Sequence, residues 1–443
     1  MSHEPVPPST EGHAYSVGEL LRFAPVRRLL VSNFLLFAGV ALQAAALGKQ
    51  AFDITGREAD IGFIGLAEFL PAALLVLVTG SVADRFNRRV VALFAVFGEL
   101  LSSVALLIYA STEPTSVGPL FVIAFGYGVA RAFQAPAMRS MPPMVAPEGA
   151  LPRTFALFSA TWTAAVIIGP AASGFLYAID PWVAYLGSTV LMFLGWIGIW
   201  TVRFVRHPEP PDPSQRPTLH SALEGLRFIR RTPTLLAAIS LDLFAVLFGG
   251  AVALLPVIAE ERLGVGDVAY GWLRAAPGIG AAAMAILIAM RPVRRHVGRT
   301  LLTAVAVFGV CTVVLGLTRS YAVAFVMLVV LSGADMVSVF IRGSLVPLLT
   351  PDEKRGRVLA VENVFIGASN ELGAFESGVA AQAFGTPAAV VGGGVGTLAV
   401  VGIWAVSFPS LRRIDRFEDL EHAHSAGADA DAGVTAAGGR PSG

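Results

Sequence analysis

Residues 29–48 read LLVSNFLLFAGVALQAAALG, twenty residues without a charged side chain. Because an α-helix rises about 1.5 Å per residue, this stretch is long enough to cross a hydrocarbon core of about 30 Å. The rest of the chain is similarly apolar: of its 443 residues 55% are hydrophobic and 14% are charged, and the mean hydropathy is +0.69. Soluble domains carry about 25% charged residues. The composition therefore argues against a water-soluble fold and predicts an integral membrane protein.

Further apolar stretches of similar length follow along the chain, and each can span a membrane as one helix. The twelve predicted spans are residues 29–48, 61–83, 90–110, 118–138, 154–178, 182–202, 234–259, 269–290, 300–318, 321–341, 358–383 and 387–407. The first residues are polar and lack the apolar core of a signal peptide, so we expect the first span to direct insertion.

Basic residues lie mainly in alternate loops, and such loops stay on the cytoplasmic side. The predicted cytoplasmic side holds Arg22, Arg27, Arg28, Arg85, Arg88, Arg89, the arginines from Arg203 to Arg231, Arg291, Arg294, Arg295, Arg299, Arg342, Lys354, Arg355, Arg357, Arg412 and Arg413. The opposite side holds Lys49, Arg57, Arg262 and Arg319. With an even number of spans, this asymmetry predicts a multi-pass protein of the cell (inner) membrane with both termini in the cytoplasm.

The two halves of the chain repeat each other. At an offset of 204 residues, the matching positions are Pro143 and Pro347, Pro147 and Pro351, Arg153 and Arg357, Gly169 and Gly373, and Ser173-Gly174 and Ser377-Gly378. At an offset of 209, they are Asn33 and Asp242, and Gly62 and Gly271. Duplication of this size is typical of secondary transporters, whose substrate site lies between the repeats.

The repeat predicts the domain organisation and the fold class. We expect an all-α integral membrane fold with twelve transmembrane helices in two pseudo-symmetric six-helix bundles. The segments are a cytoplasmic N-terminal segment (1–28), an N-terminal bundle (29–202), a Pro- and Arg-rich cytoplasmic linker (203–233), a C-terminal bundle (234–407) and a cytoplasmic, mostly disordered tail (408–443).

The loop between the second and third spans reads GSVADRFNRR (80–89) and resembles the signature of the major facilitator superfamily. The resemblance implies a gate motif made of Gly80, Asp84, Arg85, Arg88 and Arg89. In that family the carboxylate is thought to latch the N-terminal half to the start of the eleventh span, here near Arg357. The alternative is that Arg88 and Arg89 only fix the topology, an explanation that does not need Asp84.

The fifth span contains AVIIGPAASG (165–174), which resembles the signature of the superfamily's antiporters. Its antiporter-like residues are Gly169, Pro170 and Gly174. The proline kinks the helix, and the small residues let the eighth span or another neighbour approach closely. Kinked packing without any role in antiport is the alternative interpretation.

Three further stretches resemble the transmembrane secretion effector branch of that superfamily, which includes siderophore exporters. They are RAFQAPAMRSMPPMV (131–145), SLDLFAVLFGGAVALLPVIAEERLGVG (240–266) and FIGASNELGAFESG (365–378). With the loop motif, the resemblance extends over residues 20–415. It implies a monomeric, proton-coupled exporter that moves a small organic molecule (a siderophore, drug or metabolite) by alternating access. An importer or a lipid flippase on the same fold is the alternative.

Charged side chains near the middle of a membrane cost at least ~2.5 kcal/mol, so each needs a partner, a water-filled cavity or a proton. The candidate proton and substrate site consists of Asp242, Glu371, Arg131, Glu99, Asn370 and Glu376. We expect the eleventh span to line a polar cavity and Asp242 or Glu371 to take up a proton. Arg131 is expected to pair with an acid or to bind an anionic substrate. A salt-bridge network that only holds helices together is the alternative.

Other function classes find no support in the sequence. It contains no Walker loop, HExxH motif or nucleophile elbow, and the loops are too short for a catalytic domain, so we expect no enzyme and no cofactor. Cys311 is the only cysteine and predicts neither a disulfide nor a cysteine metal site. The expected partners are a small-molecule substrate, protons and membrane lipid, and the net charge of +1 gives no indication of nucleic acid.

Overall fold

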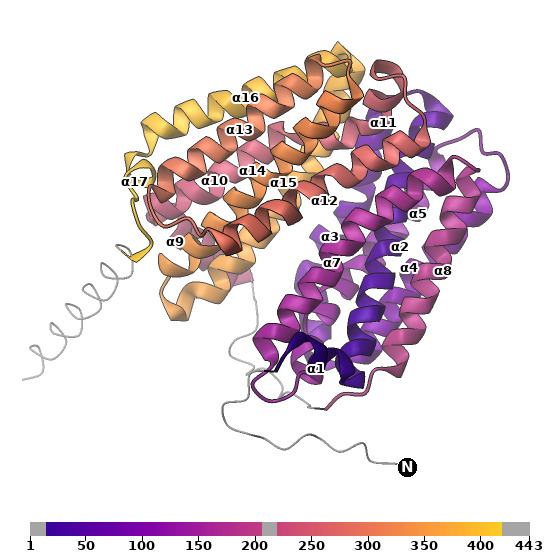
Figure 1. Cartoon of the computed structure of the whole chain (residues 1–443), viewed down its shortest axis with the longest axis horizontal. Helices are drawn as coiled ribbons and strands as arrows, with labels where there is room; N and C mark the ends of the chain where they lie inside the picture. The colour runs from indigo at the N-terminus through magenta and orange to yellow at the C-terminus, as the bar shows by residue number, and fades with distance from the viewer. Residues whose placement is uncertain (1–14, 206–218, 419–443) are drawn as a thin grey trace, which may run out of the picture. The chain divides into compact units, whose positions relative to one another are not determined.

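The computed structural model describes residues 15–205 and 219–418, and these residues form helices without a strand (Figure 1). Parts of the predicted N-terminal segment, linker and tail lie outside the described residues.

Residues 15–205 form eight helices. They are α1 (Val17–Arg22), α2 (Ala24–Thr55), α3 (Glu58–Arg85), α4 (Arg88–Ala110), α5 (Gly118–Arg139), α6 (Pro142–Val145), α7 (Leu151–Tyr177) and α8 (Pro181–Thr201). The six long ones correspond to the six predicted spans. The short helix α1 begins at a capping box, in which Ser16 and Glu19 satisfy each other's backbone amides.

The second half begins with a helix that the linker prediction did not include. Its elements are α9 (Leu219–Arg231), α10 (Pro233–Phe248), η2 (Gly250–Leu254), α11 (Leu255–Val257), η3 (Ile258–Arg262), α12 (Asp267–Met290), α13 (Val297–Leu317), α14 (Tyr321–Leu348), α15 (Asp352–Phe384), α16 (Thr386–Ser407) and α17 (Pro409–Arg412). The predicted seventh span is thus α10 followed by a 3₁₀ turn, α11 and a π turn. Gly249, Gly250 and Pro256 explain the break, because glycine and proline weaken the regular helical ladder.

Ten helical segments in the described residues are long and apolar enough to cross a membrane. Two more, α3 and α15, have 28 and 33 residues, which exceeds the about 20 residues that a span needs. In α15 the hydropathy is lowered by acidic side chains, among them Glu362 and Glu371.

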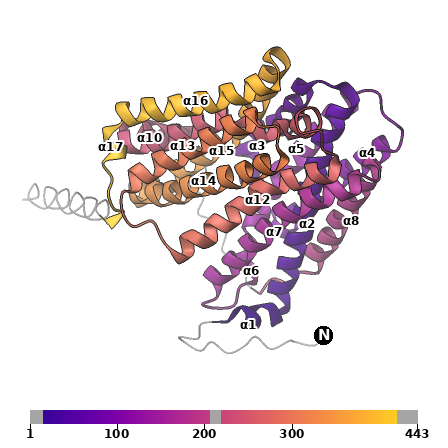
Figure 2. The same ribbon diagram turned by 45° about the horizontal axis from the view of Figure 1, so that its top comes forward.

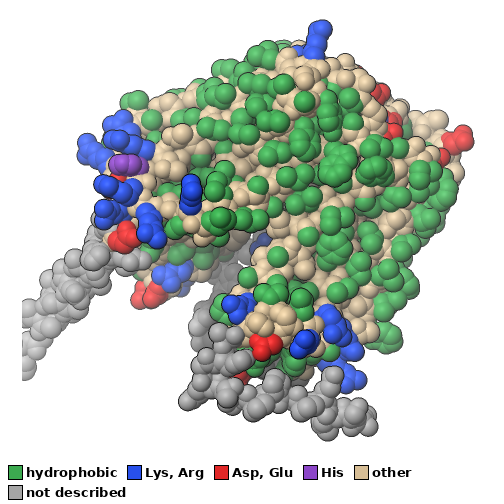
Figure 3. Space-filling view, viewed as in Figure 1, with side chains coloured by type: hydrophobic (Ala, Val, Ile, Leu, Met, Phe, Trp, Pro, Cys, Tyr) green, Lys and Arg blue, Asp and Glu red, His purple; other side chains and the backbone are tan. Residues whose placement is uncertain are grey.

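Figure 3 shows hydrophobic side chains along the helices, with Lys and Arg gathered around α17 and around α1. The fold is an all-α membrane fold, as predicted.

The chain divides into two compact units that follow the predicted halves with two exchanges. Unit 1 is Met1–Thr55, Leu70–Arg216 and Asp267–Ala275, and unit 2 is Gly56–Phe69, Pro217–Gly266 and Ala276–Gly443. The start of α12 therefore belongs to unit 1, and the start of α3 belongs to unit 2.

Both units repeat one packing pattern. In unit 1, α2 packs against α7 and α8, and α4 packs against α5 and α8. In unit 2, α10 packs against α15 and α16, and α13 packs against α14 and α16; the last pair runs side by side in Figures 1 and 2. These neighbours correspond helix by helix, which confirms the two pseudo-symmetric bundles.

Glycines at equivalent positions make close helix contacts in both units. A Cβ atom added to Gly174 of α7 would lie 2.8 Å from the Cα of Gly271 in α12. In unit 2, a Cβ atom added to Gly378 of α15 would lie 3.3 Å from the Cα of Gly62 in α3. These two pairs are related by the offsets of 204 and 209 residues found in the sequence. The eighth span thus approaches the fifth through small residues, as the sequence predicts.

The linker helix α9 packs onto the beginning of α15 and belongs to unit 2. Ile229 is 1% exposed, Gly225 lies against the backbone of Arg357, and the Lys354 ammonium group is 5.2 Å from the centre of the Phe228 ring. The predicted tail also begins with ordered residues, because the side chain of Leu411 in α17 is fully buried.

Candidate functional site

An arginine and an aspartate form a buried ion pair inside unit 2. Arg342 of α14 is 4% exposed and Asp242 of α10 is 5% exposed. The guanidinium Nη2 is 2.7 Å from Oδ1 of Asp242. The sequence predicts that the tenth span ends at residue 341 and that Arg342 lies in the cytoplasmic loop. That assignment is wrong, because the apolar residues that follow continue α14 to Leu348.

Two more acids surround this pair. Nη1 of Arg342 is 3.9 Å from Oε1 of Glu362, which is 7% exposed on α15. Asp335, two turns before Arg342 on α14, interacts electrostatically with Asp242 and Arg342. Asp242 and Asp335 line a cavity of about 10 Å³ together with Phe308, and this volume is close to the minimum for one water molecule.

The charges in this cluster do not balance. One guanidinium group faces the three carboxyl groups of Asp242, Asp335 and Glu362 among the described residues. An uncompensated charge in a membrane span costs at least ~2.5 kcal/mol, so three ionised carboxylates beside one arginine are unfavourable. The cluster is therefore suited to hold one or two protons, or a cation.

The other predicted residues of α15 make contacts outside this cluster. Asn370 is exposed and its Nδ2 donates to the carbonyl oxygen of Ile366 at 2.8 Å. The Ser377 hydroxyl donates to Glu376 at 3.4 Å. Oε2 of Glu371 lies 3.1 Å from the place where a Cβ atom of Gly65 would be. The structure thus brings Asp242 together with Arg342 and Glu362, and Glu371 lies beside α3.

Glu99 and Arg131 form a second charged group, inside unit 1. Glu99 of α4 is fully buried, and neither of its carboxyl oxygens has a hydrogen-bond partner among the described residues. Arg131 of α5 attracts it electrostatically. Ionised carboxylates without hydrogen bonds are strongly disfavoured in such surroundings.

We therefore expect a neutral amide of the same size to be tolerated at this position. The thermal midpoint of purified Glu99→Gln in detergent should correspond to a stability within about 1 kcal/mol of wild type. Glu99→Asp, which shortens the side chain and leaves a gap, serves as the comparison. A much less stable Glu99→Gln variant would show that the carboxylate is ionised and paired with Arg131.

The predicted gate motif lies at the junction of α3 and α4. Gly80, Asp84 and Arg85 occupy the last turns of α3, and their side chains lie outside the described residues. Arg88 and Arg89 begin α4, whose N-terminus is capped by the side chain of Asn87. Arg357, the expected partner of the gate carboxylate, forms an ion pair with Glu224 of the linker helix α9. Its bond to Asp84 remains a prediction.

The predicted antiporter-like residues lie where α7 meets α2 and α12. Gly169 is in contact with α2, since an added Cβ atom would lie 2.7 Å from the carbonyl oxygen of Ala38. Pro170 and Gly174 lie against the first turns of α12. These contacts show close packing, and a role in antiport remains a prediction.

The loop before α13 reads RPVRRHVGR (291–299) and has no acid equivalent to Asp84 in the loop between α3 and α4. Asp415, which follows α17, places a carboxylate beside it. Oδ1 of Asp415 accepts a hydrogen bond from the backbone amide of His296 at 3.1 Å and lies 2.7 Å from its Nδ1. The side chain of Arg295 is 3.8 Å away. The amide hydrogen bond, followed by the neighbouring cations, holds the pKa of the Asp415 carboxyl below its ordinary value.

Comparison with known proteins places the chain in a family. A family model described as "Transmembrane secretion effector" matches residues 21–434. The multidrug efflux pump Tap of Mycolicibacterium fortuitum is 25% identical over 413 residues, which cover 88% of this chain and 97% of Tap. Macrolide efflux protein A of Streptococcus pyogenes is 25% identical over 211 residues, which cover 47% of this chain and 52% of that protein.

A solved structure agrees with the fold. The structure of a bacterial homologue of the human lysosomal transporter Spinster superposes with a TM-score of 0.66 at 15% sequence identity and covers 88% of this chain and 96% of its own. The helical packing, the duplicated bundles and the family match lead to the same conclusion. The chain belongs to the transmembrane secretion effector family of the major facilitator superfamily and is a membrane transporter.

Proposed function

We propose that this protein exports a small organic molecule in exchange for protons. We also propose that the Arg342 cluster, which consists of Arg342, Asp242, Asp335 and Glu362, carries the protons. The observation that supports this most is the excess of two carboxyl groups over Arg342 in a buried part of unit 2. Such an excess is stable only when protons or another cation compensate it. A site of this kind can change its charge during transport.

The geometry suggests how protonation and transport are coupled. When Asp242 is ionised, it holds Arg342 through the contact at 2.7 Å. When Asp242 is protonated, this attraction weakens, and α10 and α14 lose the charge pair that joins them. Protonation therefore changes the contacts of helices in unit 2, as an alternating-access transporter requires. Asp335 and Glu362 are the neighbouring groups that exchange the proton with Asp242.

The relatives support outward transport of drug-like molecules. The names of Tap and of macrolide efflux protein A describe efflux of multiple drugs and of macrolides. We propose that this chain exports a molecule of that kind, with siderophores and metabolites as alternative substrates.

We also propose that it acts as a monomer in the cytoplasmic membrane with both termini in the cytoplasm, and that Asp84 forms the gate.

The proposal is tested in inverted vesicles whose interior has been acidified. Addition of an exported macrolide or cationic dye should release protons from wild-type vesicles. Asp242→Asn keeps the size of the side chain but cannot exchange a proton, so we expect it to abolish this release. Glu371→Gln is the matched comparison, because Glu371 lies on α15 beside Gly65 of α3. We expect Glu371→Gln to retain the response.

The vesicle experiment also separates the competing assignments. Loss of proton release in Glu371→Gln alone would assign the proton site to Glu371 instead of the Arg342 cluster. Transport that persists without proton release in the wild type would contradict proton coupling and favour a uniporter or a lipid flippase. The amount of each variant in the membrane is measured in parallel.

A further inference from the structure

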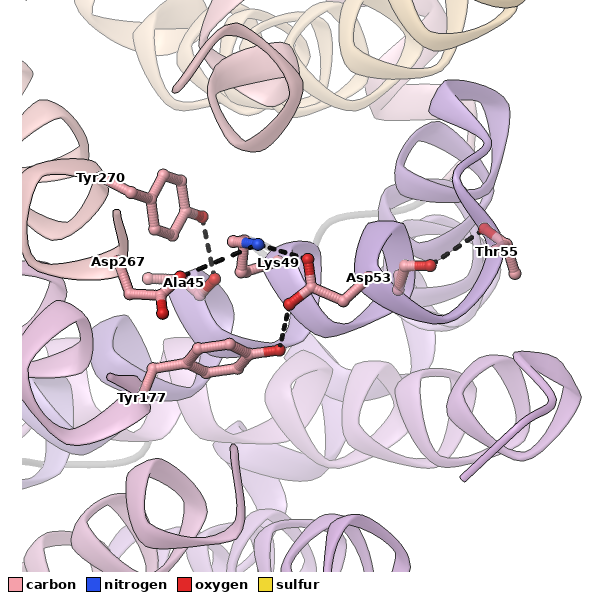
Figure 4. Close-up of polar contacts among 8 residues, drawn as sticks. Ala45, Lys49, Asp53, Thr55, Tyr177, Asp267 and Tyr270 are labelled. Carbon is pink, nitrogen blue, oxygen red and sulfur yellow. Dashed lines mark hydrogen bonds and ion pairs between the residues drawn. The ribbon is translucent and has the colours of Figure 1, made fainter. Parts of the chain in front are cut away.

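A further group of polar side chains lies in unit 1 around the buried Lys49 and has no part in the proton site. We call it the Lys49 cluster; it consists of Lys49 and Asp53 of α2, Tyr177 of α7, and Asp267 and Tyr270 of α12 (Figure 4). Lys49 is 8% exposed and forms an ion pair with Asp53 one turn further along α2. Its Nζ is also 3.8 Å from Oδ1 of Asp267, the first residue of α12.

Two tyrosines complete the cluster. The Tyr177 hydroxyl donates to Oδ2 of Asp53 at 2.8 Å, and the Tyr270 hydroxyl donates to the carbonyl oxygen of Ala45 at 2.9 Å (Figure 4). Lys49 and Tyr270 therefore both join the first turns of α12 to α2. Since α12 continues into unit 2 after Ala275, these contacts hold one end of a helix that both units share.

The charges of this cluster differ from those of the Arg342 cluster. Lys49 faces Asp53 and Asp267, and Arg274 acts electrostatically on Tyr270 in the same place. When Arg274 is counted with these five residues, two cations face two carboxylates, whereas in the Arg342 cluster one cation faces three carboxyl groups. Its contacts are suited to holding helices together rather than to carrying protons.

The two units differ in this cluster although they share the packing around it. The glycine contact between α7 and α12 has its equivalent between α15 and α3. At the same offsets, the positions equivalent to Lys49, Asp53, Tyr270 and Tyr177 are Ile258, Arg262, Ile61 and Ala381. The equivalent of Asp267 is Glu58, which accepts a hydrogen bond from Thr386 at 3.5 Å. Packing is thus common to both units, whereas the buried lysine and its partners occur in unit 1.

From this asymmetry we infer that Lys49 is a latch, which holds the start of α12 on α2 in the state described here and releases it when the protein opens to the outside. The inference rests on the proposed alternating access. Lys49 acts by positioning α12 and does not need to touch the substrate. The predicted topology places this end of α2 away from the arginine-rich cytoplasmic side.

The local contacts explain how the latch can release without leaving a buried charge alone. Asp53 lies on the same helix as Lys49 and is held by Tyr177, so Lys49 keeps one carboxylate when α12 departs. The side chain of Asp267 is already 31% exposed and becomes hydrated on opening. Release therefore breaks the Lys49–Asp267 ion pair and the Tyr270 hydrogen bond, while the Lys49–Asp53 pair within α2 persists.

The test measures access to the surface beneath Tyr270. Ala45 is fully buried, so a cysteine at this position, in a Cys311→Ser background, should react slowly with a membrane-impermeant maleimide added to intact cells. Asp267→Asn removes the ion pair with little change in shape. We expect it to raise the labelling rate roughly threefold, since an ion pair at 3.8 Å with a partly exposed carboxylate contributes less than a hydrogen bond to a charged group.

The chain offers a matched control in the other unit. Glu58→Gln changes the position equivalent to Asp267 and should leave the labelling of Ala45→Cys unchanged. An unchanged rate in Asp267→Asn, an equal increase in Glu58→Gln, or an increase seen only in inverted vesicles would each overturn the inference. Labelling requires neither substrate nor a proton gradient, so failure of the proposed proton coupling would not be mistaken for failure of the latch.

A second measurement remains informative if the cysteine at position 45 disturbs folding. Lys49→Cys combined with Asp267→Cys is joined by a short, reducible bifunctional thiosulfonate reagent. We expect the cross-linked protein to lose transport and to regain it on reduction, because α12 can then leave α2 again. Transport at the uncross-linked rate by the fully cross-linked protein would contradict the latch, as would a failure of the two cysteines to cross-link.

Discussion

Replacement of Arg342 by methionine is expected to abolish transport and to lower strongly the amount of folded protein. Arg342 is the cation that compensates Asp242 and Glu362, both of which are less than 9% exposed. Removal of one partner from a buried ion pair typically costs about 3–5 kcal/mol, because the remaining charge is left in a medium of low dielectric constant. Monodisperse protein after detergent extraction and the thermal midpoint measure this loss.

A double variant separates the structural effect from the functional one. In Arg342→Met with Asp242→Asn the arginine is gone and Asp242 is replaced by a neutral amide, so we expect stability to recover in part while transport stays absent. Arg342→Lys keeps the charge but loses the forked guanidinium geometry, and we expect an intermediate effect. A single variant Arg342→Met that folds and transports like wild type would show that the cluster has neither role.

The sequence predicts the fold well because membrane insertion depends on local properties. Twenty uncharged residues at 29–48 predict a spanning helix whatever surrounds them, since the bilayer requires backbone groups to be satisfied within the helix. The duplication can also be recognised in the sequence, because close helix packing requires a glycine at both equivalent positions, Gly174 and Gly378. The bounds of the helices are less predictable: α2 extends from Ala24 to Thr55, beyond the predicted span.

The Arg342 cluster is less predictable because the residues that contact one another in it are far apart in the sequence. Asp242 is recognisable as an acid inside a span, yet its partner Arg342 is 100 positions further along the chain. An arginine at the end of an apolar stretch indicates a loop, and only the packing of α14 against α10 shows that Arg342 is buried. Lys49 is similar: charge counting assigns it to the outer side, and nothing local reveals its contact with Asp267.

Substitution of Gly174 by alanine is expected to destabilise the protein by about 1–3 kcal/mol, and substitution by leucine is expected to prevent folding. The added Cβ atom would lie 2.5 Å from the carbonyl oxygen of Asp267, which is backbone and cannot move aside alone. Gly392→Ala in α16 is the control, because no described atom outside its own helix lies within 4 Å of the added carbon. Thermal unfolding in detergent should show no loss for that control, since alanine is the better helix former.

The equivalent glycine of unit 2 then decides between the two interpretations of the antiporter-like motif. At Gly378 the added carbon would lie 2.9 Å from the carbonyl oxygen of Glu58, so we expect Gly378→Ala to destabilise the protein less than Gly174→Ala. If the motif serves packing alone, the number of protons released per substrate should be unchanged in both variants. If it serves antiport, Gly174→Ala should lower that ratio and Gly378→Ala should not. We expect an unchanged proton ratio in both variants, because a close backbone contact explains the presence of glycine at both positions.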